Sequence, residues 1–240
     1  MHSGIGYDKC LTFINCQIKP TKDGKGRGGK PRRFRAVTIS RESGSGACEI
    51  AEQLAARLQS GPHSGKRPWT VFDKNLVTRV LEDHHLPKRM ADCIPEDRRT
   101  ELQDAVEEFF GLRPPSWTLI HHTSETILRL VELGNVILIG RGSNMVTRDH
   151  SEVLHIRLVG SEQMRAMRIA DARKISRKAA LEVLRKEDRG RARYVKKYFS
   201  ADIGDPCLYH MVFNTDLVSQ IHVVTVLSAI ISGDLAPLAA

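Results

Sequence analysis

The chain has 240 residues, of which 41% are hydrophobic and 27% are charged, and this composition excludes collagen-like and wholly disordered proteins. No apolar run approaches the roughly 18 residues that a membrane-spanning helix needs, and the five cysteines are scattered without a C-x-x-C pair. We therefore expect one globular domain, or one domain with a small inserted lobe, in the reducing cytoplasm, with no membrane contact, no disulfide framework and no metal site of its own.

The positive charge is concentrated in the first 35 residues. They hold nine Lys and Arg against two Asp, or +7 of the net charge of +9, whereas the other 205 residues hold 28 basic and 26 acidic side chains. Glycine and proline interrupt the basic residues and leave little to bury, so we predict a disordered basic extension over 1–35. Two interpretations of it stay open: a solvated tail, or a segment that binds nucleic acid or an acidic partner. We expect no nucleic-acid contact elsewhere.

The predicted fold begins with a strand, a glycine-rich loop and a helix. Residues 36–40 are β-rich, and they lead into the turn-forming residues 43–46. From Ala47 the apolar residues recur at intervals of three and four as far as Leu58, which is typical of one face of an amphipathic helix.

The next segment is predicted to be mostly helical. A short strand over 69–72 leads into Asp73, which is expected to cap a helix. Three helical patterns follow, over 76–81, over 102–110, and from Thr123 or Ser124 to Gly134. We assign them to a helical lobe over about 73–130.

The second half of the chain alternates strands with helices. Strands are expected at 136–139, 153–159 and 211–213, and helices from Ser161, from Ser176 and over 217–231. The four consecutive apolar residues of 136–139 indicate a strand that is buried on both faces. The alternation predicts an α/β fold in which a parallel sheet lies between two layers of helices, followed by a short tail over 233–240.

The chemistry of the chain is expected where the strands end, because ligands of parallel sheets bind at their carboxyl edge. There the loop over 43–46 offers backbone N–H groups and a positive helix end to a phosphate, although glycine also serves ordinary tight turns. Six arginines after the strand over 153–159 favour phosphate, because guanidinium groups bind its oxygens bidentately. They are Arg165, Arg168, Arg185, Arg189, Arg191 and Arg193, and Glu182, Glu187 and Asp188 among them could neutralise part of the charge.

Five short motifs occur along the chain in a definite order. They are ISRESGSG with EIA at 39–51, FDK at 72–74, IGRG at 139–142, DRGRARY at 188–194, and GDP at 204–206 before FNT at 213–215. Together they resemble the cytidylate kinase-like family, which is similar to the bacterial cytidylate kinases among the P-loop nucleoside monophosphate kinases. The resemblance covers about residues 36–232.

The resemblance implies a kinase that uses ATP and Mg²⁺ and binds small nucleotides, with an acceptor lobe and a lid over about 171–200. It implies a phosphate-binding loop formed by Ser43, Gly44, Ser45, Gly46, Ala47 and Cys48. It implies acceptor contacts from Asp73, Arg79, Arg141, Asp188 and Arg191. The candidate catalytic residues are Arg41, Arg165, Arg168 and Arg189.

Four positions depart from the expected pattern. The standard P-loop ends in a Lys that bridges phosphates and a Ser or Thr that binds magnesium, and here these two positions are Ala47 and Cys48. Arg41 stands at the first glycine of the loop, and we hypothesise that it reaches the β- and γ-phosphates and partly replaces the lysine. Gly142 stands where the related cytidylate kinases have an acid that contacts the cytosine amino group.

The sequence therefore predicts transfer of the γ-phosphoryl group from Mg-ATP to a nucleoside monophosphate, with CMP as the first choice. Two alternatives stay open. Ala47 and Cys48 favour a silent nucleotide-binding or regulatory module, and Gly142 favours a kinase of a different small acceptor. The Cys48 thiol at a helix start is either reactive or, as we expect, a residue that simply lines the loop.

Overall fold

The computed structural model describes residues 34–61, 68–73 and 117–233. The basic extension, Arg79, the helices expected at 76–81 and 102–110 and most of the predicted acceptor lobe lie outside these residues. None of the helices within the described ranges is both long and apolar enough to cross a membrane.

Five parallel strands form one sheet, in the order β2-β3-β1-β4-β5. Their bounds are β1 Ala36–Arg41, β2 Thr70–Phe72, β3 Val136–Ile139, β4 Val153–Val159 and β5 Met211–Asn214. The central strand β1 pairs with β3 on one side and β4 on the other, so that Ile39 lies beside Ile139 and Ile156. All five strands had been predicted to within about two residues, because apolar runs mark them clearly.

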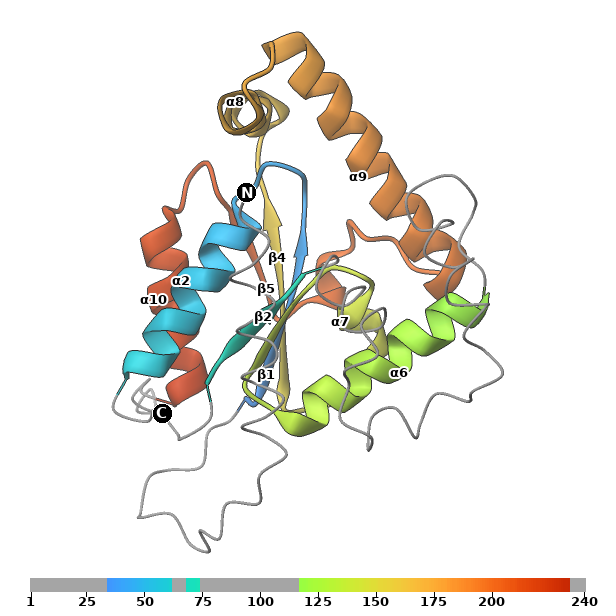
Figure 1. The fold of residues 1–240 in the computed structure, drawn as a ribbon, viewed down its shortest axis with the longest axis vertical. Coiled ribbons are helices and arrows are strands. Elements are labelled where there is room, and N and C mark those ends of the chain that lie inside the picture. Colours follow the sequence, from blue (N-terminus) through green and yellow to red (C-terminus); the bar gives the residue numbers. More distant parts are fainter. Residues whose placement is uncertain (1–33, 62–67, 74–116, 234–240) are drawn as a thin grey trace, which may run out of the picture.

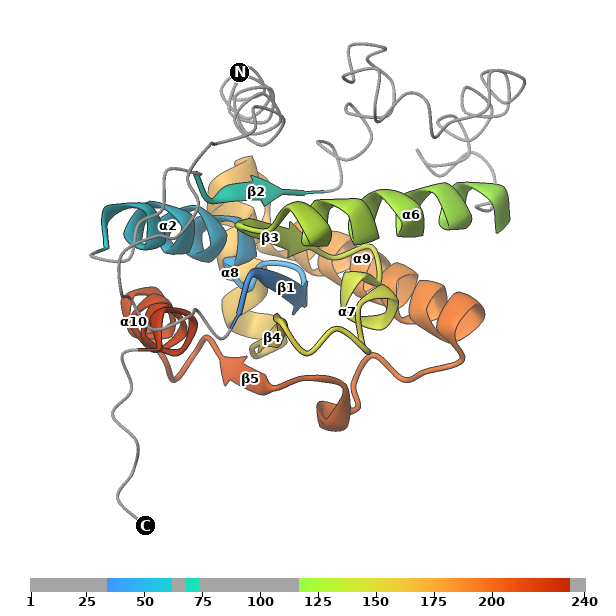
Figure 2. The same ribbon diagram turned by 90° about the horizontal axis from the view of Figure 1, so that it is seen from below.

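Helices cover both faces of this sheet (Figure 2). On one face, α2 (Ala47–Ser60) and α10 (Gln220–Ser232) pack against the buried side chains of β1, β3 and β4. On the other face, α6 (Trp117–Leu133) packs against β2 and β3, and the short helix α7 (Ser143–Val146) lies beside it. The predicted α/β fold with helices on both sides of a parallel sheet is thereby confirmed.

Two further helices stand beyond the carboxyl ends of the strands (Figure 1). Helices α8 (Glu162–Arg173) and α9 (Arg177–Phe199) form a small core of their own, which includes Ile169, Ala180 and Leu184. Their N-caps are Ser161 and Ser176, as predicted, and each hydroxyl accepts a hydrogen bond from the amide three residues later. A 3₁₀ turn, η3 (Pro206–Leu208), precedes β5.

Two helices differ from the prediction in length. Helix α6 begins at Trp117 rather than at Thr123 or Ser124, because Thr123 is a buried residue inside the helix and not a cap. Helix α9 continues through the basic segment for 23 residues. Lysine and arginine are good helix formers, and most of them lie on its exposed side.

Candidate functional site

A cleft of about 450 Å³ opens at the carboxyl ends of β1, β2 and β3, with α9 as its opposite wall. Its position follows from the parallel sheet, whose strands all end at this edge. The charged residues that line the cleft are Arg41, Asp73, Arg141, Arg173, Glu187 and Arg191. Four positive charges against two negative ones make the cleft attractive to an anion.

Two of these arginines, Arg41 at the end of β1 and Arg141 just after β3, lie where burial and a neighbouring positive charge disfavour their charged forms. Burial, followed by the charge of Arg191, lowers the pKa of Arg41 to about 10. Burial also lowers the pKa of Arg141 to about 10, with the charge of Arg41 acting in the same direction and Tyr194 acting against it. Like charges that are brought together away from water raise the free energy of the ligand-free protein, and a bound phosphate would relieve this repulsion.

The turn after β3 explains how Arg141 reaches the cleft. Gly140, Arg141 and Gly142 have φ angles of 80°, 59° and 64°. Three consecutive left-handed residues are rare, and such strain is typical of functional sites. The Arg41 guanidinium lies directly over Gly140, where any side chain would collide with it.

The same turn leaves no room for an acid at position 142. A Cβ atom added to Gly142 would lie only 2.5 Å from Cε2 of Phe199, at the end of α9. An aspartate with this backbone would therefore displace the Phe199 ring. Gly142 is thus a requirement of the packing between β3 and α9.

The glycine-rich loop between β1 and α2 has the shape of an anion site. Gly44 and Gly46 have φ angles of 75° and 79°, which favour glycine. The backbone N–H and the hydroxyl of Ser45 both donate to the Glu42 carbonyl, at 3.3 and 2.7 Å. Gly46 is the N-cap of α2 and provides no side-chain hydrogen bond to the first amides of the helix. These amides and the helix dipole favour a negatively charged ligand.

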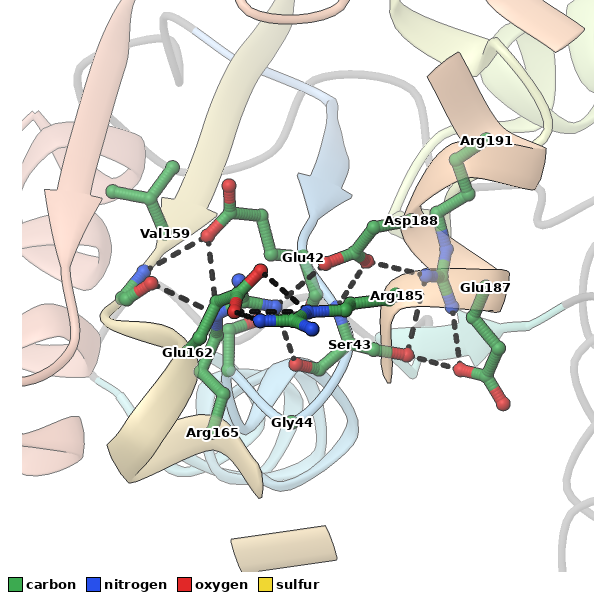
Figure 3. Close-up of polar contacts among 12 residues, drawn as sticks. Glu42, Ser43, Gly44, Val159, Glu162, Arg165, Arg185, Glu187, Asp188 and Arg191 are labelled. Carbon is green, nitrogen blue, oxygen red and sulfur yellow. Dashed lines mark hydrogen bonds and ion pairs between the residues drawn. The ribbon is translucent and has the colours of Figure 1, made fainter. Parts of the chain in front are cut away.

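Arg165 of α8 connects this loop to its surroundings (Figure 3). It is 4% exposed. Its Nε donates to the Gly160 carbonyl at 2.8 Å and lies 3.3 Å from a carboxylate oxygen of Glu42. Its Nη1 donates to the Ser43 carbonyl at 3.0 Å and to Asp188 at 2.6 Å. Arg165 therefore holds the glycine-rich loop against α8 and α9.

Arg168, one turn later on α8, contacts the next residue of the loop. Its Nη1 donates to the Gly44 carbonyl at 3.3 Å and to the Thr215 hydroxyl at 3.0 Å. Its Nη2 donates to the Thr215 carbonyl at 2.8 Å and lies 3.5 Å from Asp216. The segment after β5 and the glycine-rich loop are thus joined through one guanidinium group.

Helix α9 contributes two carboxylates that point at Ser43 (Figure 3). The Ser43 N–H donates to Asp188 at 2.8 Å, and the Ser43 hydroxyl donates to Glu187. Arg191, on the same face of the helix, donates to Asp188 at 2.9 Å and to Glu187 at 3.2 Å. Burial alone would raise the pKa of Glu187, but its hydrogen bonds from Ser43 and Arg173 and the charge of Arg191 lower that pKa to about 2.

The structure brings most of the predicted site residues together at this edge of the sheet. They are Arg41, Ser43 to Cys48, Asp73, Arg141, Arg165, Arg168, Asp188 and Arg191. Arg189 is not among them, because it lies on the exposed side of α9. Cys48 lines the cleft. Although the residue is exposed, partial removal of its thiol from water, followed by the charges of Glu49 and Asp73, raises its pKa, which favours a protonated thiol over a nucleophile.

Sequence reasoning missed two residues of the site and undervalued a third. Glu42 receives a hydrogen bond from the Gly160 N–H at 3.1 Å as well as the ion pair with Arg165. Arg173 pairs with Glu187 at 2.9 Å. Glu187 was expected only to neutralise arginines. The helical spacing of Glu187 and Arg191 could have placed both on one face of α9, but nothing in the sequence indicates that this face meets the loop.

A family model now covers most of this fold. The model of the cytidylate kinase-like family matches residues 36–217. The chain belongs to this family. The cytidylate kinase-like match includes the glycine-rich loop, the cleft and α9, so the resemblance that the motifs indicated is confirmed.

A solved structure shares the fold of this family member at low sequence identity. An uncharacterized protein from Eubacterium ventriosum is 18% identical with a TM-score of 0.62, over 84% of this chain and 99% of that one. A shikimate kinase from Bacteroides thetaiotaomicron is 12% identical with a TM-score of 0.46, over 81% of this chain and 95% of that one. No curated protein matches the sequence.

Proposed function

We propose that the protein transfers the γ-phosphoryl group of ATP to a nucleoside monophosphate, with CMP as the first acceptor to test. The observation that carries this proposal is the cleft with four arginines next to a glycine-rich loop at a helix start. The glycine-rich loop suits the phosphates of a donor, and the arginines of the cleft suit the phosphate of an acceptor. Membership of a kinase-like family supports phosphoryl transfer in general.

The donor is expected to bind over the glycine-rich loop. Backbone N–H groups of Ser43, Gly44, Gly46 and Ala47 would hold its β-phosphate, whereas the Ser45 N–H donates to the Glu42 carbonyl. Cys48 would line the same loop. Arg165 and Arg168 would neutralise charge that develops on the transferring phosphoryl group. The transfer needs no covalent intermediate on the protein. The side chains of Arg165 and Arg168 contact the carbonyls of Ser43 and Gly44, which places both guanidinium groups beside the loop.

The acceptor is expected in the cleft, with its phosphate among the arginines. Arg141 and Arg191 would bind the phosphate, and Asp73 and Asp188 would orient the nucleotide. Arg41 would act between the two substrates, because its guanidinium lies over Gly140 on the cleft side of the loop. From this position we propose that Arg41 partly replaces the missing lysine.

Mg²⁺ is expected to enter with ATP. Within the described ranges, no cluster of three or more His, Cys, Asp or Glu side chains could hold a metal alone. Protein sites for nucleotide-bound Mg²⁺ need only one or two carboxylates beside the phosphates. Asp73 lines the cleft, so besides orienting the acceptor it would supply one such carboxylate to the ion. The ion would neutralise charge on the donor phosphates.

We further propose that α8 and α9, including the segment over 171–200, form a lid that excludes water, and that the lobe over about 73–130 holds the acceptor. Two further predictions stay proposals: that residues 1–35 form a disordered basic extension, and that the protein is located in the cytoplasm. Arg189 stays a prediction for a rotated position of α9, since its present side faces solvent.

A second candidate function is a kinase of a different small acceptor. The packing of Phe199 over Gly142 favours it, because this position has no acid to contact the cytosine amino group and an acid there would displace the Phe199 ring. A silent nucleotide-binding module is the third possibility, favoured by Ala47 and Cys48.

The decisive experiment is product formation by chromatography with Mg-ATP and a panel of CMP, dCMP, UMP, AMP and GMP. ADP together with one nucleoside diphosphate, both lost in Arg141→Ala, would identify the reaction and its acceptor. Nucleotide binding without product at high enzyme concentration would contradict the nucleoside monophosphate kinase and leave the silent module and the kinase of a different small acceptor.

A further inference from the structure

Two carboxylates of α9 already use the hydrogen-bond donors at Ser43. The backbone N–H donates to Asp188, and the hydroxyl donates to Glu187. Both groups belong to the loop that we assign to phosphate. A loop that binds anions therefore holds anions of its own chain in the ligand-free protein (Figure 3).

The surroundings of Asp188 match those of a bound phosphate. One carboxylate oxygen accepts from Ser43 N–H at 2.8 Å and from Arg191 at 2.9 Å, and the other accepts from Arg165 at 2.6 Å. Two guanidinium groups and a backbone amide on one anion are the donor set that proteins use for phosphate.

Glu187 stands where the loop meets the cleft. Its carboxylate contacts Ser43 and, at 2.9 and 3.2 Å, Arg173 and Arg191, and it also lines the cleft. A phosphate that passes between the loop and the cleft would meet this carboxylate. Two negative groups in such proximity repel each other, so they cannot share the site at low cost.

We propose that Glu187 and Asp188 form an internal anion that fills the phosphate position at Ser43, and that a phosphate group must displace this pair in order to bind. The inference rests on the proposed function only in that the loop binds phosphate. Because only the displaced state is competent, the contact lowers the apparent affinity of the loop for phosphate ligands.

Glu187→Gln tests the proposal, with inorganic pyrophosphate as the probe and titration calorimetry as the measurement. Glutamine keeps the length but loses the charge, and we expect pyrophosphate to bind about tenfold more tightly than to the wild-type protein. The control is Glu182→Gln, which makes the same charge change on an exposed position of the same helix. Its effect should stay within about twofold, since a solvated charge is screened.

A second pair of variants separates the contact from the charge. In a Ser43→Ala background the gain from Glu187→Gln should shrink, because the hydroxyl that Glu187 occupies is absent. Thermal unfolding shows whether each variant is folded. If Glu187→Gln does not fold, Glu187→Asp replaces it: this carboxylate is one methylene shorter and should give a smaller gain in the same direction.

The outcomes distinguish this inference from the proposed reaction. Equal or weaker binding to Glu187→Gln, a gain no larger than that of Glu182→Gln, or no pyrophosphate binding by any variant would overturn the internal anion. A tenfold gain without phosphorylation of any nucleoside monophosphate would support the internal anion and contradict the nucleoside monophosphate kinase. Phosphorylation of a nucleoside monophosphate without tighter pyrophosphate binding by Glu187→Gln would support the kinase and contradict the internal anion.

Discussion

Gly142 and Gly190 border the same cleft, but a side chain would meet very different surroundings at the two positions. At Gly142 it would meet the Phe199 ring in a left-handed backbone, whereas at Gly190 nothing lies within 4 Å. We expect Gly142→Ala to lower the free energy of unfolding by about 2–4 kcal/mol. Gly190→Ala should raise the free energy of unfolding by about 0.5–1 kcal/mol, because alanine has a higher helix propensity than glycine in a helix interior. Urea unfolding measures both, and equal effects would contradict this packing.

Arg41 allows a prediction about catalysis at the residue scale. If it replaces the missing lysine, Arg41→Ala should lower kcat by about 10³-fold or more, because charged groups on the transferring phosphoryl contribute that much. Arg148→Ala is the matched control, since Arg148 is an exposed arginine whose charge pairs with Asp149 at the surface. Unchanged turnover and ATP affinity in Arg41→Ala would show that another cation has the role.

At the scale of an element, strand β4 contains a buried histidine that should make stability depend on pH. His155 is 5% exposed and contacts Thr38 at 2.7 Å. Burial, followed by the charge of His210, lowers the pKa of His155 from 6.5 to about 4. The unfolded chain therefore binds the proton first, so the stabilisation is complete above about pH 6.5 and is lost between pH 6.5 and 4.

The loss should amount to about 3 kcal/mol, because one pKa unit corresponds to about 1.4 kcal/mol. We expect the free energy of unfolding of the wild-type protein to fall over this range more steeply than that of His155→Gln. Parallel pH profiles of the two proteins would refute a neutral buried histidine.

The elements also show how far the sequence could go. Strand β3 is four apolar residues long, and that pattern alone predicted its bounds and burial. The glycine-rich loop and Arg141 followed from the same reasoning, because strand ends and short motifs are local features. The contact of Glu187 with Ser43 spans 144 residues. No local pattern encodes it, because it depends on the direction in which α9 leaves α8.

At the scale of the whole molecule, ligand binding should stabilise the fold through the elements that meet at the cleft. A nucleotide at about 100 times its Kd adds about 2.7 kcal/mol to the free energy of unfolding. For a chain of this size the melting temperature should then rise by about 5–10 °C. Differential scanning calorimetry with CMP, and with Arg141→Ala as the variant that loses the shift, measures this. A shift that survives in Arg141→Ala would place the ligand elsewhere.

The packing of Phe199 on Gly142 fixes the C-terminal end of α9, so the helix can tilt about that end. The aromatic end of the helix is seated on the turn after β3, whereas Glu187 lies twelve residues earlier, or about 18 Å along the axis. A rotation of about 10° around the seated end moves the carboxylate by about 3 Å, which is the length of a hydrogen bond. Small tilts of α9 are therefore enough to open or close the polar contacts at Ser43, while the contact between Phe199 and Gly142 stays in place.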